Sequence, residues 1–170
     1  MTGRVGELIA VLEEETACYD RLYEFAQKKR DHVINRELEQ LERLTSDEQD
    51  ISSRLKNLEK KRLRLLDELL SESAESTESA TVTKVIATLA EGSEERRSLE
   101  NARDELVASA TRMQFLNQQN EVLLKQALEM VEFDLTLFKS LRQAPETANY
   151  DRNAYSTGDI LPSGGFDAKQ

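Results

Sequence analysis

The sequence predicts an all-α protein: an elongated antiparallel helical hairpin or three-helix bundle with coiled-coil-like packing, followed by a flexible C-terminal tail. Three observations support this fold class. Apolar residues recur at steps of three and four over two long stretches, which is a helical period. Charged residues make up 33% of the chain and aromatic residues only 5%, which favours long helices that each bury one stripe. Residues 7–91 contain neither proline nor glycine.

The N-terminal half is predicted to form two helices, at about 4–43 and 47–70. Its apolar stripe slips by one residue after Val33, as expected when a straight helix departs from a strict heptad repeat. Ser46 followed by Gln49 can act as a capping box, so we expect a break near Thr45, with one continuous helix as the alternative. The stripe consists of Val5, Leu8, Leu12, Tyr19, Leu22, Ala26, Val33, Ile34, Leu38, Leu41, Leu44, Ile51, Leu55, Leu58, Leu65 and Leu69.

A linker and two further helices are predicted next. The stripe is lost in the Ser-rich segment 71–80, where Ser side chains compete with the helical backbone for hydrogen bonds. A short helix at about 82–90 follows, which Gly92 ends, and Ser93 caps the next helix. That last helix is predicted to cover about 94–142.

Residues 144–170 are predicted to be a tail that is disordered or folds on binding a partner, behind a helical domain of residues 1–143. Pro145 is expected to stop the last helix. The tail holds only five large apolar residues, whose burial would contribute about 10 kcal/mol. Ordering its backbone costs roughly 27–54 kcal/mol, so the tail should not fold unaided.

The charge and the cysteine content limit the classes of partner and the compartment. A net charge of −10 disfavours nucleic acid and anionic membrane surfaces. No apolar stretch approaches the ~20 residues that span a bilayer, so no stable membrane insertion is expected. Cys18 is the only cysteine, which fits a reducing cytosol, and Glu7 and Glu13 interrupt any signal-peptide pattern. We therefore expect a cytoplasmic protein.

No residue pattern predicts catalysis, a metal site or a cofactor. His32 is the only histidine and is expected on a helix surface, and the sequence contains no phosphate-binding loop. Glu13, Glu14 and Glu15 point in three directions on a helix and are expected to be solvated, whereas Cys18 should be a small buried or half-buried residue. A basic cluster is expected to pair with Glu59, Asp67 and Glu68, with an RNA or phosphate contact as the alternative; it comprises Lys56, Lys60, Lys61, Arg62 and Arg64.

An amide-rich run, Leu116–Asn120, interrupts the apolar stripe of the last helix. Amides cost stability in a helix seam but fix its register when they find a partner. Asn120 is therefore expected either to set the register or to mark the place where the bundle opens.

Three blocks of residues give the chain a resemblance to the FlgN family of flagellar export chaperones. The second of them is Glu48–Gln49 with Leu55, Leu58–Glu59 and Arg62, and the third is Asn120-x-x-Leu123–Leu124 with Ala127–Leu128. The ending, Phe166–Lys169, is also similar to that of family members. The first block consists of Leu8, Leu12, Glu15, Tyr19, Leu22, Ala26, Lys28, Lys29, Ile34, Leu38 and Leu41.

The resemblance implies a cytoplasmic, non-enzymatic chaperone of the flagellar type III export system. Such a protein binds the C-terminal segments of hook-associated (hook–filament junction) proteins, keeps them unpolymerised and delivers them to the membrane export gate. Helix-in-groove recognition is suited to that task, because client helices with one apolar face would otherwise self-associate. A structural or scaffolding coiled coil is the alternative function, and monomer and dimer are both compatible with the sequence.

The client site is expected on the second half of the last helix, together with the tail. One apolar stripe there, Leu124, Ala127, Val131, Phe138 and Leu141, is expected to form the helix seam. A second stripe adjoins it and either binds the client or packs under a third helix; the resemblance favours the client, because its third block begins this region. The predicted partner-binding residues are Asn120, Leu123, Met130, Phe133, Leu137, Tyr150, Tyr155 and Phe166.

Overall fold

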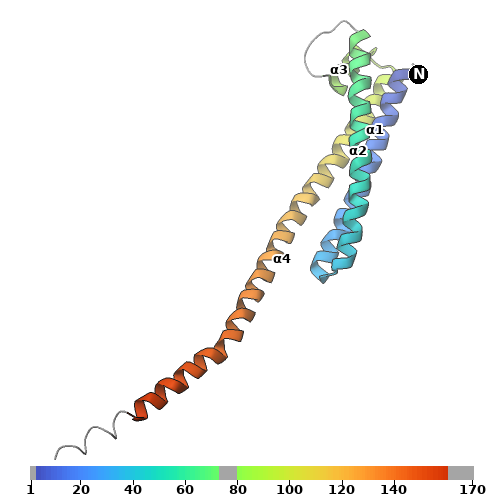
Figure 1. Cartoon of the computed structure of the whole chain (residues 1–170). Coiled ribbons are helices and arrows are strands. Elements are labelled where there is room, and N and C mark those ends of the chain that lie inside the picture. Colours follow the sequence, from blue (N-terminus) through green and yellow to red (C-terminus); the bar gives the residue numbers. More distant parts are fainter. Residues whose placement is uncertain (1–2, 73–79, 161–170) are drawn as a thin grey trace, which may run out of the picture. The chain divides into compact units, whose positions relative to one another are not determined.

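A computed structural model describes residues 3–72 and 80–160, with side chains for 3–71 and 80–143. Four α-helices and no strand occur in this part of the chain, which confirms the all-α prediction (Figure 1). The helices are α1 (Gly3–Asn35), α2 (Leu38–Glu72), α3 (Val82–Thr88) and α4 (Glu94–Ile160). The chain divides into two units, Met1–Leu124 and Lys125–Gln170.

In the first unit, α1 and α2 form the expected antiparallel hairpin (Figure 1). Ion pairs along it join early residues of α1 to late residues of α2: Arg4 lies 3.8 Å from Glu68, whereas Lys29 lies 2.6 Å from Glu48. The N-terminal part of α4 packs on this hairpin and runs in the direction of α1. Its Ser109 donates to Asp20 at 2.7 Å, and eleven residues later Asn120 donates to the Ala26 carbonyl at 2.6 Å.

The core of this unit is a single layer of aliphatic side chains between the helices. Leu8, Leu12 and Leu99 are fully buried within it. The short helix α3 covers one end, since its Val82, Val85 and Ile86 belong to the same cluster. A smaller cluster, Leu22, Phe25 and Leu44, continues the packing toward the α1–α2 turn. The apolar period of three and four therefore does identify the buried faces.

The break between the first two helices lies at Arg36 and Glu37, and the predicted break near Thr45 is wrong. Arg36 adopts a φ of 58°, and its N–H donates to the carbonyl of Val33. The N–H of Glu37 donates to the carbonyl of His32. This pair of bonds is a Schellman motif, which satisfies carbonyls at a helix C-terminus. Glycine usually occupies the left-handed position of that motif, so an arginine there left no signal in the sequence.

Thr45 lies inside α2, where its hydroxyl donates to the carbonyl of Leu41 at 2.8 Å. This bond to the preceding turn lets a threonine remain in a helix. The other predicted boundary near the middle of the chain agrees with the structure. Gly92 has a φ of +74° after α3, and the Ser93 hydroxyl accepts from the N–H of Arg96 at 3.2 Å at the start of α4.

The last helix continues to Ile160, beyond the end predicted at residue 142. Pro145 was expected to stop it; an interior proline removes a backbone hydrogen bond and disfavours helical angles in the residue before it, but it can kink a helix without ending it. The behaviour expected of residues 144–170, folding only with a partner, stays a prediction. The Ser-rich segment predicted as a linker lies largely outside the described residues, at 73–79.

Candidate partner-binding surface

The described side chains of the second unit lie on one stretch of α4 that is apolar around most of its circumference. At about 100° of rotation per residue, the large apolar residues from Leu128 to Leu141 cover about 220°. The remaining arc carries Glu129, Glu132, Thr136 and Lys139. A helix packed on one neighbour needs an apolar stripe only a little over 100° wide. This stretch therefore has apolar surface for two neighbours.

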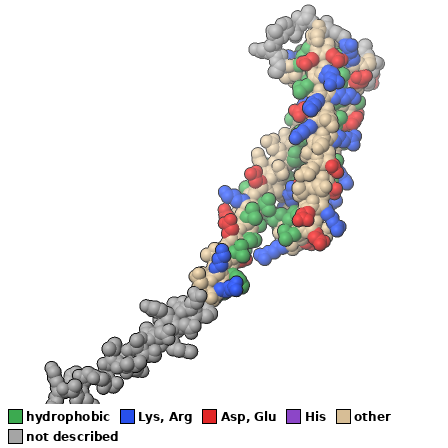
Figure 2. Space-filling view, in the orientation of Figure 1, with side chains coloured by type: hydrophobic (Ala, Val, Ile, Leu, Met, Phe, Trp, Pro, Cys, Tyr) green, Lys and Arg blue, Asp and Glu red, His purple; other side chains and the backbone are tan. Residues whose placement is uncertain are grey.

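All of these apolar side chains are exposed. They are between 48% and 66% accessible, and hydrophobic side chains lie at the surface of this part of α4 (Figure 2). At about 200 Å² for each large side chain, they expose roughly 900 Å², whereas the largest patch on a monomeric protein is about 300–600 Å². The residues are Leu128, Met130, Val131, Phe133, Leu135, Leu137, Phe138 and Leu141.

Both predicted stripes are exposed, although one of them was expected to be packed in a helix seam. Met130, Phe133 and Leu137 were predicted to bind a client and are exposed. Val131 and Phe138 were predicted to lie in a packed seam, yet they are exposed to a similar degree. The helical period places these residues on faces correctly, but it does not tell whether a neighbouring helix extends far enough to cover a face.

The predicted site residues at the start of this region lie in the first unit. Asn120 is buried, and its Nδ2 donates to the Ala26 carbonyl of α1, while its Oδ1 has no partner. This amide bond ties α4 to α1, as expected of a residue that sets the register. Leu123 is half-buried. Asn120 is thus not part of an exposed surface, and the three tail residues, Tyr150, Tyr155 and Phe166, have side chains outside the described residues.

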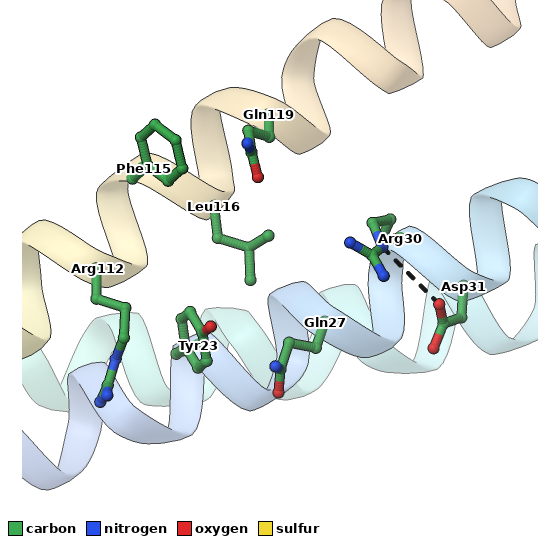
Figure 3. Close-up of a pocket in the computed structure, with 8 residues that line it drawn as sticks. All are labelled: Tyr23, Gln27, Arg30, Asp31, Arg112, Phe115, Leu116 and Gln119. Atoms are coloured by element: carbon green, nitrogen blue, oxygen red, sulfur yellow. Dashed lines mark ion pairs between the residues drawn. The ribbon is translucent and has the colours of Figure 1, made fainter.

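A groove of about 460 Å³ lies between α1 and α4 in the first unit (Figure 3). Leu116 points toward α1 from its floor, and Phe115 is 63% exposed at its edge. Its cations are already compensated: Arg112 lies 2.8 Å from Asp20 and 4.8 Å above the Tyr23 ring, and Arg30 lies 4.0 Å from Asp31. The groove therefore offers no excess charge to hold an anion.

Glu15 is the residue that sequence reasoning misplaced. It was expected to be solvated with Glu13 and Glu14, but it is 2% exposed in the interface between α1 and α2. One carboxylate oxygen lies 3.3 Å from Nε of Arg62, and the other has no partner. Burial raises the pKa of Glu15 above its ordinary 4.5, which the Arg62 charge only partly offsets. The sequence did contain a signal for this burial, because Glu15 follows Leu12 by three residues and so falls on the apolar face of the helix.

Burial also determines the chemistry of Cys18, the lone thiol. Cys18 is buried as predicted, and burial raises the pKa of its thiol, which disfavours the reactive thiolate. In residues 3–71 and 80–143 no group of His, Cys, Asp and Glu side chains is arranged to hold a metal ion. None of the helices described is long and apolar enough to cross a membrane.

Fold and surface together define an all-helical protein whose last helix leaves a long run of apolar side chains exposed. Comparison with protein-family models shows the family of the chain: the model of the FlgN protein family matches residues 1–157. The chain therefore belongs to the FlgN family, whose members act as flagellar export chaperones. Comparisons with curated proteins and with solved structures give no match.

Proposed function

We propose that this protein chaperones the C-terminal helical segments of hook–filament junction proteins, which it binds on one face of α4. The client face consists of Met130, Phe133 and Leu137. In this proposal the protein acts in the cytoplasm, keeps its clients unpolymerised and delivers them to the membrane export gate. The observation that carries the proposal is the exposed apolar surface from Leu128 to Leu141, which exceeds what a monomeric protein normally leaves in water.

The chemistry of the client face fits a helical client with one apolar side. Met130 and Phe133 are 59% and 66% exposed, and a flexible thioether beside an aromatic ring can adapt to different apolar side chains. A client helix lying along α4 would hide the apolar side chains by which it otherwise self-associates. Residues 144–170 are proposed to close over the bound helix, with Tyr150, Tyr155 and Phe166 as anchors. Ordering this segment would lower the net affinity and keep the client releasable.

The test compares the double variant Met130→Asp with Phe133→Asp against a matched control, Lys125→Gln with Thr136→Asp. Each of the two double variants lowers the net charge by two. The control residues, however, lie on the polar arc of the same helix. Client binding is measured by calorimetry and folding by circular dichroism. We expect the double Asp variant to keep its helix content and to lose client binding, whereas the control binds as the wild type does.

A truncation after Arg142 tests the contribution of the tail in the same assays. We expect an unchanged melting temperature and weaker client binding. If the double Asp variant unfolds, the client face is part of the folded core and the proposal is wrong. If the double Asp variant and the truncation both bind the client as the wild type does, the client binds elsewhere on the chain.

A further inference from the structure

The exposed side of α2 carries a cluster of cations that takes no part in the proposed client site. We call it the basic row; it consists of Lys56, Lys60, Lys61 and Arg64. All four side chains are exposed, and Lys and Arg side chains lie along this helix in Figure 2. At about 100° per residue they fall within an arc of about 140°, opposite the buried Leu58 and Leu65. Lys56, Lys60 and Arg64 form a line about 12 Å long.

The basic row is not neutralised by its own chain. Of the carboxylates expected to pair with this part of α2, Glu59 lies 3.9 Å from Arg62, and Glu68 lies 3.8 Å from Arg4. In residues 3–71 and 80–143 no carboxylate forms an ion pair with a residue of the basic row. The reason is local for the two central lysines, because no carboxylate lies three or four residues before or after Lys60 or Lys61.

The spacing of the basic row is unfavourable for the free protein. Lys60 lies four residues after Lys56 and four residues before Arg64, so the three charges are neighbours on the helix surface. Like charges at this spacing destabilise a helix, and they stand here although the chain contains 33 acidic residues. An outside group of opposite charge would offset that cost.

A shallow hollow of about 410 Å³ continues the exposed side of α2 toward its N-terminus. Most of its residues are small, so a second helix can approach the α2 backbone closely at this point. Leu63, which is 48% exposed beside the basic row, adds one apolar contact. Hollow and row together extend about 28 Å along α2, the length of a helix of about 20 residues. The hollow is lined by Thr45, Glu48, Gln49, Ser52, Ser53 and Lys56.

We propose that the basic row and the hollow bind an acidic helix of a partner protein other than the client. The partner helix lies along α2 with a carboxylate at every fourth residue. Its carboxylates then have the same spacing of about 6 Å as Lys56, Lys60 and Arg64, with which they pair. A small side chain of the partner occupies the hollow. This site goes beyond the proposed function and shares no residue with the client face.

Nucleic acid and anionic membranes fit the same cations less well. Proteins bind single-stranded nucleic acid with aromatic side chains on which bases stack, and neither the basic row nor the hollow contains one. Helices that lie on membranes bury an apolar face, whereas Leu63 is the one exposed large apolar residue among residues 45–64. Both ligands also carry charge beyond the row, where a chain of net charge −10 repels it. An acidic helix places its charge on the row alone.

Fluorescence anisotropy of the full chain with two labelled synthetic peptides tests the proposal. Both are stapled helices of the same alanine- and glutamate-rich composition; the glutamates stand at every fourth residue in the one-face peptide and all around the helix in the dispersed peptide. We expect sub-millimolar binding of the one-face peptide and at least about fivefold weaker binding of the dispersed peptide. Lys60→Glu with Arg64→Glu should weaken the one-face peptide at least about tenfold. Equal binding of the two peptides, no binding of either, or a double variant without effect would overturn the proposal.

A matched control excludes a general effect of charge. Lys28→Glu with Arg97→Glu makes the same change in net charge at two exposed positions outside the basic row, and it should bind the one-face peptide as the wild type does. Equal weakening by test and control variants would refute a specific site. Misfolding is excluded by Lys60→Glu alone, which replaces two repulsive helix neighbours by attractive ones. It should raise the melting temperature by about 2–8 °C while it weakens the one-face peptide.

The two other ligands are titrated in the same assay, as single-stranded RNA of about 20 nucleotides and as vesicles that contain anionic lipid. If either binds more tightly than the one-face peptide and loses binding in Lys60→Glu with Arg64→Glu, the basic row serves that ligand and the acidic-helix proposal is wrong. The client-face variant, Met130→Asp with Phe133→Asp, should bind the one-face peptide as the wild type does. Failure of this proposal and failure of the client proposal are therefore distinguishable.

Discussion

Arg36, the residue that ends α1, offers the sharpest test of how the hairpin is built. Its φ of 58° is in the left-handed region, and two Schellman hydrogen bonds require that conformation. The left-handed conformation costs an ordinary L-residue about 1–2 kcal/mol, because the Cβ approaches the following carbonyl oxygen. Glycine avoids that cost but loses more backbone entropy on folding, roughly 0.5–1 kcal/mol. Arg36→Gly should therefore stabilise the hairpin by about 0.5–1 kcal/mol.

The measurement is chemical and thermal unfolding of Arg36→Gly beside Arg36→Ala. The arginine side chain is exposed, so its removal alone should change little. Arg36→Ala keeps the Cβ and should leave the stability near that of the wild type, while Arg36→Gly raises the melting temperature by about 1–4 °C. Equal effects of glycine and alanine would refute the reasoning, because the gain would then not come from the left-handed conformation. A destabilised glycine variant would show that the turn does not need that conformation.

Three further predictions concern buried residues of the first unit. Because burial raises the pKa of Glu15 above 4.5, the folded state keeps its proton to higher pH than the unfolded chain does, so the free energy of unfolding should fall as the pH rises above about 4.5. Glu15→Gln should remove this dependence, and parallel pH curves of the two proteins would contradict it. Asn120→Ala should cost about 1 kcal/mol, measured by urea unfolding, because it removes the bond to Ala26. Leu99→Ala should cost about 2–5 kcal/mol in the same assay, since this side chain is fully buried; a smaller loss would mean that the core collapses around the gap.

The helices themselves were predictable because their signal is local. An apolar period of three and four identified which side of each long helix is buried, and Leu8, Leu12 and Leu99 lie where that period placed them. Gly92 and Ser93 mark the boundary before α4, since glycine and serine have well-defined roles at helix ends. The family resemblance added the class of function, which the match to residues 1–157 supports.

The predictions for Glu15 and for the break between the first two helices failed for different reasons. Glu15 lies on the buried face of α1, three residues after Leu12, and Arg62, 47 residues later in the sequence, lies 3.3 Å from its carboxylate. The α1–α2 turn lies at Arg36, although the sequence has a stronger capping signal at Ser46, because a Schellman motif can form with any residue that accepts the left-handed conformation. Residue type alone carried no information on either contact.

The sequence by itself determined the fold class, the faces of the helices and the family. The fold class and the helix faces follow from residue spacing along one helix, which is independent of where the other helices lie. The family follows from the resemblance of three blocks of residues, which the match to residues 1–157 supports. Only the tertiary structure decided which faces are covered: the same period is buried at Leu99 and Leu106 and exposed at Val131 and Phe138. Burial requires a second surface at contact distance, and the position of that surface is set by packing between segments far apart in the chain.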